Sequence, residues 1–172
     1  MVPQCPRDPV PQGAGKESIV DKILIGSDHA GFKLKEGLKK YLEKIGLRVE
    51  DAGTYSQERC DYPYFAAAVA GKVSAGKYKK GILICKTGIG NSIVANRFPG
   101  VRASLCYTIK AARLTREHND SNILVLGSVF ADDRLAKRIT QVWLQTPFLG
   151  GRHQKRLNLI KQIEANIRSK KR

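Results

Sequence analysis

The sequence predicts a single α/β domain built on a Rossmann-like, doubly wound sheet of five parallel strands flanked by helices. Short apolar runs alternate along the chain with longer segments whose apolar residues recur at helical spacing, as in repeated strand–helix units. The 172 residues, 42% of them hydrophobic, are enough to enclose one sizeable core. We find no internal repeat and no break in composition that would indicate a second folded domain.

The chain begins its regular structure with two predicted strand–helix units. A strand at residues 22–27 leads into a helix whose leucines recur at helical spacing and which Gly46 closes. A shorter strand follows at residues 47–51. Pro63, which suits the first turn of a helix, then opens an alanine-rich helix that runs to Ser74.

The alternation continues through the second half of the chain. We predict a third strand that ends at Cys85, a fourth strand at 101–107, a helix at 109–117, a fifth strand at 122–126, a helix at 132–144 and a last helix at about 153–167.

The two ends of the chain differ from this core. Residues 1–21 contain four of the seven prolines and no periodicity, so we expect a disordered or loosely attached tail. The folded domain is predicted at residues 22–167. Residues 168–172 are predicted to form a basic tail.

Charge and cysteine content limit the class of protein. There are 31 Lys and Arg against 15 Asp and Glu, a formal net charge of +16, which attracts nucleic acid, anionic membranes or anionic metabolites. The basic residues are scattered and no zinc-finger or ribonucleoprotein motif accompanies them, which favours a solvated basic surface over nucleic-acid binding. Four widely spaced cysteines suggest neither a zinc site nor disulfides. No apolar run approaches the ~20 residues that span a bilayer, and no secretory signal is visible, so we expect a soluble, cytoplasmic protein.

Residues 81–96 hold the strongest candidate for a functional site. The apolar run 82–84 ends at Cys85, and the turn Thr87–Gly90 leads into a segment that can be helical. Glycines let the backbone approach a ligand, and the free N–H groups of a helix start suit a phosphate or a transient oxyanion. The same pattern fits a small core cysteine followed by a turn that binds nothing, and the residues alone leave both interpretations open.

Asp28 and His29 fall in the loop after the first strand, where an acid and an imidazole can face a ligand. Asp28 can equally cap the next helix and His29 can be an exposed loop residue, and the motif alone favours this simpler interpretation. Arg152 and Arg156 would share one face of the last helix, either as ordinary surface residues or as a fork for a phosphate.

Five motifs, in order along the chain, resemble the type B ribose-5-phosphate isomerases and the related galactose-6-phosphate isomerase subunits. The resemblance extends from about Lys22 to Glu164, nearly everything but the two tails. The motifs are Gly-Ser-Asp-His-Ala-Gly-Phe-Lys-Leu-Lys at 26–35, Asp61-Tyr62-Pro63, Cys85 with Thr87-Gly88-Ile89-Gly90, Arg116-Glu117-His118-Asn119-Asp120 and Gly151-Arg152-His153-Gln154-Lys155-Arg156.

The resemblance implies an enzyme of the pentose phosphate pathway that interconverts ribose 5-phosphate and ribulose 5-phosphate through an enediolate, without a metal or an organic cofactor. It also implies a homodimer, or a dimer of dimers, whose sites are shared between subunits. By position, Cys85 is the base that carries a proton between C1 and C2, and the helix start and Lys86 beside it are expected to lower its pKa. Thr87 and the N–H groups of Gly88 and Gly90 correspond to the donors that stabilise the oxyanion.

The remaining site residues follow from the resemblance in the same way. Asp28 and His118 correspond to the pair that opens the sugar ring, and His118 and Asn119 would come from the partner subunit. His29, Arg152 and Arg156 correspond to the phosphate ligands. Asp61 and Tyr62 correspond to residues that line the sugar site.

Two positions depart from the family pattern. Lys86 stands where the family usually has glycine, and it either crowds the oxyanion loop or adds a positive charge near the substrate. Val129 stands where the family usually carries an arginine that helps to bind phosphate. Losing one charge-assisted hydrogen bond of roughly 1.5–3 kcal/mol would weaken binding about ten- to a hundredfold unless another cation replaces it.

Two alternatives therefore remain beside the pentose isomerase. One is an isomerase of a hexose 6-phosphate, such as allose or galactose 6-phosphate. The other is a non-catalytic protein that binds a sugar phosphate or nucleic acid on the same fold.

Overall fold

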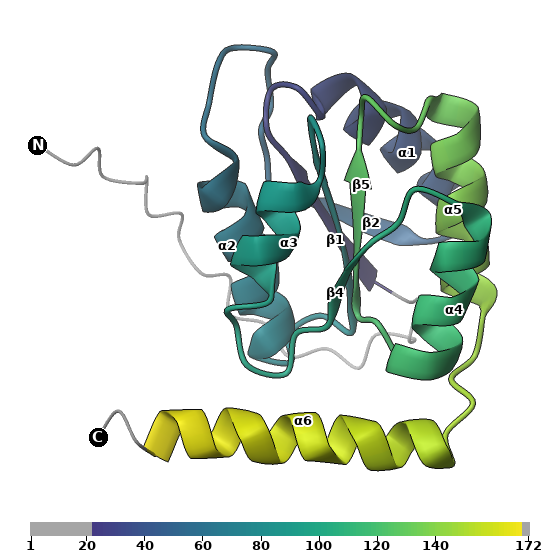
Figure 1. The fold of residues 1–172 in the computed structure, drawn as a ribbon. Helices are drawn as coiled ribbons and strands as arrows, with labels where there is room; N and C mark the ends of the chain where they lie inside the picture. The colour runs from purple at the N-terminus through teal and green to yellow at the C-terminus, as the bar shows by residue number, and fades with distance from the viewer. Residues whose placement is uncertain (1–21, 170–172) are drawn as a thin grey trace, which may run out of the picture.

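Figure 1 presents the chain as a computed structural model that describes residues 22–169. Strands alternate with helices from β1 to α5, and a long helix, α6, follows. The elements are β1 (Lys22–Ser27), α1 (Phe32–Lys44), β2 (Arg48–Asp51), α2 (Tyr62–Ser74), β3 (Lys80–Cys85), α3 (Ile89–Ala95), β4 (Ala103–Leu105), α4 (Ile109–Asn119), β5 (Ile123–Gly127), α5 (Asp133–Gln145) and α6 (Arg152–Ser169). The predicted N-terminal tail at 1–21, and residues 170–172 of the predicted basic tail, lie outside the described residues.

The five strands form one parallel sheet in the order β2-β1-β3-β5-β4, which confirms the predicted architecture. Helices α2 and α3 cover one face of the sheet, and α1, α4 and α5 cover the other (Figure 1). From β1 the chain first builds β2 on one side and then crosses to build β3 on the other. The point at which the winding reverses therefore lies between β1 and β3.

Helices bury both faces of the sheet, as is usual for parallel strands. On β3, Ile82 and Ile84 pack against the layer of α1, α4 and α5, whereas Leu83 between them packs against α2 and α3. Trp143 of α5 is fully buried in the first of these layers. Within residues 22–169, no helix is long and apolar enough to cross a membrane.

The fourth strand is shorter than predicted. A strand at 101–107 was expected, but only the three residues of β4 pair with β5. The side chain of Asn96 occupies the outer edge of β4, where it bonds both the N–H and the carbonyl oxygen of Ala103, each at 2.9 Å. This contact takes the place of a further strand and leaves the edge unable to pair with another sheet there.

Helix α6 lies across the end of the sheet at which the strands begin, outside the two helical layers (Figure 1). It begins one residue earlier and ends two residues later than predicted. Only His153 and Leu157 of α6 are buried. Its other large apolar side chains, which we call the α6 apolar face, are 46–57% exposed: Leu159, Ile160, Ile163 and Ile167.

Lys35 of α1 places a fully buried ammonium group beside the carboxyl end of β2. Its Nζ donates to Oδ2 of Asp51 at 2.6 Å and to the carbonyl oxygen of Thr54 at 2.7 Å. Asp51 also accepts from Lys39 Nζ at 2.6 Å and from the N–H of Gly53 at 2.8 Å. Burial acts to raise the pKa of Asp51, but the hydrogen bonds from these donors outweigh it and hold the pKa below its usual value.

The loop that Lys35 holds is paired with the last residue of β1. The N–H of Ser27 donates to the carbonyl oxygen of Gly53, and the N–H of Thr54 donates to the carbonyl oxygen of Ser27, both at 2.7 Å. Ser27 directly precedes Asp28. The buried lysine therefore supports the loop against which the start of the candidate site rests.

We predict that Lys35→Met lowers the free energy of unfolding by about 3 kcal/mol, because it removes the cation from a buried pair and leaves a buried carbonyl unpaired. Lys39→Met is the matched control, since Lys39 bonds the same carboxylate from a partly exposed position, and it should cost about 1 kcal/mol or less. Urea unfolding at neutral pH measures both. The pKa of Asp51 is lower in the folded protein than in the unfolded chain. The contribution of its ion pairs to the free energy of unfolding is therefore present above the unfolded pKa and is lost as the pH falls through the folded pKa. Equal losses for the two variants would contradict the special role of Lys35.

Candidate functional site

The carboxyl ends of β1 and β3 meet where the winding of the sheet reverses, the usual ligand position in open parallel sheets. Asp28 follows β1 and Cys85 ends β3, and they are only 6% and 4% exposed. The N–H of Asp28 donates to the carbonyl oxygen of Ile84 at 3.3 Å, which ties the first loop to β3. The Asp28 carboxylate accepts from the N–H of Gly31 at 2.9 Å and is close enough to raise the pKa of the Cys85 thiol.

Backbone N–H groups surround the sulfur of Cys85. The N–H of Gly88 donates to Sγ at 3.1 Å, and the N–H groups of Asn91 and Thr87 are close enough to act with it in lowering the pKa of the thiol. Gly88 has a φ of +81°, and a Cβ there would lie 2.3 Å from Cδ1 of Leu105, so the turn requires glycine. We call these three N–H groups the amide cradle. Such donors stabilise negative charge on sulfur or on a nearby oxygen.

The expected lowering of the Cys85 pKa was wrong for this chain. Burial raises the pKa of the thiol, and the hydrogen bonds from Gly88 and Asn91 lower it by less, so the pKa lies above the ordinary thiol value. The Asp28 carboxylate raises it further. The loss of hydration, which the sequence does not reveal, outweighs the helix start.

Further predicted site residues lie around the same edge of the sheet. The ring of Tyr62 packs on Gly90, where an added Cβ would lie 2.4 Å from Cζ of the tyrosine. His29 Nδ1 lies 3.0 Å from the carbonyl oxygen and 3.2 Å from the backbone nitrogen of Cys60. This contact brings Cys60 beside the loop that follows β1. Cys60 directly precedes Asp61, which is the N-cap of α2. The structure thus gathers these predicted residues at the carboxyl edge: Asp28, His29, Asp61, Tyr62, Cys85, Thr87, Gly88 and Gly90.

The other predicted residues form a second group. His118 and Asn119 end α4, and Arg152 and Arg156 lie in the first turns of α6. The rings of His118 and His153 stack with centroids 4.3 Å apart and planes 8° from parallel. The pKa of His153 is lowered by loss of hydration and by electrostatic interaction with His118, Arg152 and Arg156. The two arginines give this group a positive charge that suits an anion.

The two groups lie at opposite ends of the strands. The first lies at the carboxyl edge of the sheet, where the strands end, and the second lies at the amino edge, where the strands begin. Helix α4 runs against the strands and ends beside the start of β5, whereas Cys85 pairs with Gly127 at the end of β5. The five residues of β5 separate the edges by about 13 Å, from a rise of about 3.3 Å per residue. A single chain therefore does not bring His118 to the Cys85 thiol.

The structure adds residues that the sequence analysis missed. Tyr107 donates its hydroxyl to the carbonyl oxygen of Thr87 at 3.3 Å, and its ring lies 4.7 Å from that of Phe130. The side chain of Asn91, next to the amide cradle, is 1% exposed, and neither of its polar atoms has a hydrogen-bond partner within the described residues. No pattern in the sequence marks these residues, because their roles depend on contacts between distant segments.

The two departures from the family pattern are neighbours in space. The N–H of Val129 donates to the carbonyl oxygen of Lys86 at 3.1 Å. Val129 is 54% exposed and Lys86 is also exposed. Among residues 22–169, no cluster of three or more His, Cys, Asp or Glu side chains could hold a metal ion.

A buried thiol, an acid and a ring of N–H groups where a parallel sheet reverses its winding define a doubly wound α/β protein equipped to stabilise transient negative charge. A model of the family described as "Ribose/Galactose Isomerase" matches residues 23–160. Ribose-5-phosphate isomerase B of Escherichia coli strain K12 is 48% identical over 143 residues, 83% of this chain and 96% of that protein. The chain belongs to the ribose/galactose isomerase family, which confirms the resemblance of its motifs.

Solved structures agree with this assignment. Ribose-5-phosphate isomerase B of Clostridium thermocellum is 46% identical and superposes with a TM-score of 0.83, covering 85% of this chain and 99% of that one. The enzyme of Mycoplasma genitalium, solved with bound ribulose 5-phosphate, is 40% identical with a TM-score of 0.81, covering 84% of this chain and 96% of that one.

We predict that the Cys85 thiol of the free protein titrates above its ordinary value of 9.0, because burial disfavours the thiolate. The thiolate should be scarce at neutral pH and should appear only as the pH rises beyond that value. The ultraviolet absorbance of the thiolate, recorded as the difference between the wild type and Cys85→Ala, measures this titration. A step centred well below the ordinary value would mean that the amide cradle, and not burial, dominates.

Proposed function

We propose that this chain is an aldose–ketose isomerase that interconverts ribose 5-phosphate and ribulose 5-phosphate through an enediolate. The observation that carries the proposal is the Cys85 sulfur held within the amide cradle beside Asp28. The names of the bacterial relatives and the bound ribulose 5-phosphate in the Mycoplasma genitalium enzyme support it. We place the isomerase domain at residues 22–167 and its activity in cytoplasmic sugar metabolism.

In the proposed reaction, Cys85 acts as a base on the open-chain sugar. Its thiolate takes the proton from C2, and the electron pair of that C–H bond forms the C1–C2 double bond as the C1 carbonyl oxygen becomes negative. The N–H groups of Gly88 and Gly90 and the hydroxyl of Thr87 donate to this oxygen. A proton then passes from the C2 hydroxyl to the C1 oxygen, and the thiol returns its proton to C1, which leaves a ketone at C2.

The raised pKa of Cys85 bears on both halves of this reaction. A thiolate that is unfavourable in a dry site takes up a proton readily, so the few deprotonated molecules are strong bases. The resulting thiol keeps its proton until the enediolate accepts it. The amide cradle limits the cost of the charged form.

The remaining residues hold the sugar and open its ring. Asp28 of one subunit and His118 of a second subunit move the protons that convert the ring form into the open chain. Asn119 comes from the same subunit as His118. Phosphate binding is assigned to His29, Arg152 and Arg156, and the sugar is lined by Asp61 and Tyr62.

A homodimer, or a dimer of dimers, follows from the separation of the two groups within one chain. Cys85 and His118 lie at opposite edges of one sheet, so a complete site needs a second copy that brings its α4 end to the carboxyl edge of the first. The α6 apolar face, which begins beside the second group, is the surface that we expect the second copy to cover.

The alternatives differ in substrate or in chemistry. A hexose 6-phosphate would use the same proton transfer in a longer pocket, and the family description includes galactose. A non-catalytic binder is motivated by the +16 charge, by Lys86 and by the missing arginine at Val129.

We predict that the purified protein forms ribulose 5-phosphate from ribose 5-phosphate and that Cys85→Ala lowers kcat by about 10²-fold or more, the usual effect of losing a positioned base. Cys106→Ala is the matched control, because Cys106 is a second buried thiol, with a pKa of about 12, away from the amide cradle. Turnover by Cys85→Ala equal to that of the wild type would refute the role of the thiol. Faster turnover of allose or galactose 6-phosphate would move the assignment to a hexose, and salt-sensitive RNA binding without turnover would indicate a binder.

A second prediction tests the shared site. Cys85→Ala and His118→Ala should each be nearly inactive alone, but subunits of the two variants that exchange should recover activity. A two-fold dimer formed at random from equal amounts is half heterodimer with one intact site of two, so about a quarter of the wild-type activity should return. No recovery, in mixtures shown by differential tags to contain heterodimers, would mean that each site lies within one chain.

A further inference from the structure

We propose that Arg102, Arg116 and Asp120 form a positioning clamp that fixes the end of α4, so that His118 and Asn119 are presented to the active site of the second subunit. We call these three residues the α4 clamp. The inference rests on the shared site proposed above. None of the three is expected to touch the substrate.

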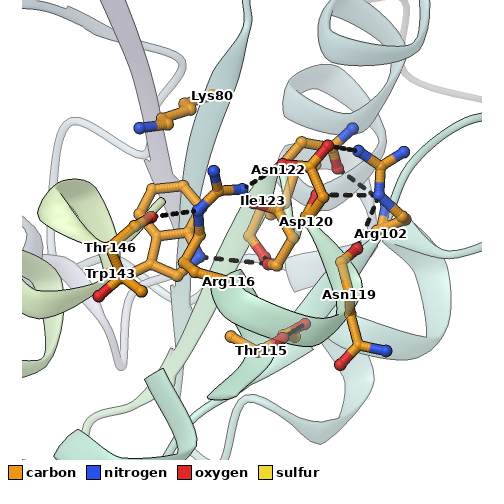
Figure 2. Close-up of polar contacts among 12 residues, drawn as sticks. Lys80, Arg102, Thr115, Arg116, Asn119, Asp120, Asn122, Ile123, Trp143 and Thr146 are labelled. Atoms are coloured by element: carbon orange, nitrogen blue, oxygen red, sulfur yellow. Dashed lines mark hydrogen bonds and ion pairs between the residues drawn. The ribbon is translucent and has the colours of Figure 1, made fainter. Parts of the chain in front are cut away.

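Asp120 is the centre of the clamp. It ends α4 in the left-handed conformation, with a φ of 43° and a ψ of 48°, and it is the only non-glycine residue with a positive φ within residues 22–169. Such a conformation persists only when neighbouring contacts support it. Each oxygen of its carboxylate bonds a different arginine: Oδ1 lies 2.8 Å from Nη1 of Arg116, and Oδ2 lies 2.7 Å from Nη2 of Arg102 (Figure 2).

Arg102 holds the backbone on the outer side of the clamp. Its Nε donates to the carbonyl oxygens of Asn119 at 3.0 Å and of Asp120 at 2.9 Å (Figure 2). Its own N–H donates to Oδ1 of Asn122 at 2.8 Å. Because Arg102 directly precedes β4, these bonds join the end of α4 to the start of the sheet.

Arg116 fixes the inner side of the clamp in the protein core. Its side chain is almost fully buried, and its Nη1 donates to the carbonyl oxygen of Ser121 at 2.5 Å while Nε donates to that of Thr146 at 3.4 Å. The guanidinium lies 6.0 Å from the ring centroid of Trp143. The Nε1 of Trp143 donates to Oγ of Ser121 at 3.2 Å. Asp120 is thus bonded to a group that cannot shift without disturbing the packing of α5.

The clamp bonds converge on the backbone of residues 119–121, immediately after His118. The side chain of Asn119 is left exposed, and His118 rests on the buried ring of His153. A fixed backbone is what such side chains need if they act in another subunit. A displacement of about 1 Å in such a group can cost about 10²-fold in rate.

The test mixes subunits of two variants and asks which pairs recover activity, because two changes in different halves of the shared site complement each other and two changes in the same half do not. Arg102→Gln should lower kcat/KM for ribose 5-phosphate about 10- to 100-fold. Arg138→Gln, which removes an exposed arginine from α5, is the matched control and should keep wild-type kinetics. Subunits of Arg102→Gln mixed with Cys85→Ala should recover about a quarter of the wild-type activity, because the heterodimer contains one site with both intact halves. Mixing with His118→Ala should recover none, since both changes fall in the same half.

Asp120→Asn provides the second variant, because asparagine tolerates the left-handed conformation but cannot form the two ion pairs. It should behave as Arg102→Gln does, and recovery in the mixture shows that the variant subunit folds and dimerises. The inference is overturned if both variants keep wild-type kinetics, or if neither complements Cys85→Ala while His118→Ala does. If Cys85→Ala and His118→Ala fail to complement each other, the shared site itself is wrong, and the clamp has no second subunit to serve.

Discussion

A parallel sheet sends every strand start to one edge and every strand end to the other, and this constraint determines how the functional site is built. Cys85, at the end of β3, lies at the carboxyl edge with Asp28, whereas His118, at the end of α4, lies at the amino edge. No rotation of side chains closes a gap the length of a strand. Each edge therefore carries only part of the residues that the motifs assign to the site, eight at the carboxyl edge and four at the amino edge, and symmetry between two copies is the simplest way to join them.

Each half is held by buried or partly buried ionic contacts as well as by the hydrophobic core. At the carboxyl edge, Lys35 bonds Asp51 and the carbonyl of Thr54, and that loop pairs with the end of β1. At the amino edge, Asp120 joins Arg102 and Arg116. Apolar packing does not specify where a loop rests to within an ångström, whereas a buried charge has few acceptable partners. Both networks lie next to residues that would contact the substrate.

The sequence predicted what depends on local patterns. The five strands, the helices between them and the positions of Asp28 and Cys85 at strand ends all follow from periodicity and from glycine turns. The length of β4 was not predictable, because the apolar run at 101–107 does not reveal which of its residues pair with β5. The burial of Lys35 was equally hidden, since a lysine on a helix normally faces solvent. The raised pKa of Cys85 has the same origin: hydration depends on the assembled fold, while the neighbouring glycines and lysine gave the opposite sign.

The two departures from the family pattern become one question once the fold is known. Lys86 adds a cation where the family has glycine, and Val129 removes one where the family has arginine, and the backbones of these residues are bonded to each other. The formal charge of this corner is therefore the same as in the family pattern, although its source has moved from the loop after β5 to the loop after β3. A lysine is a single flexible charge, whereas arginine offers a planar fork to phosphate. In the proposed reaction, the exchange would keep one positive charge in this corner but would replace the planar pair of donors of an arginine with the single charge of a lysine.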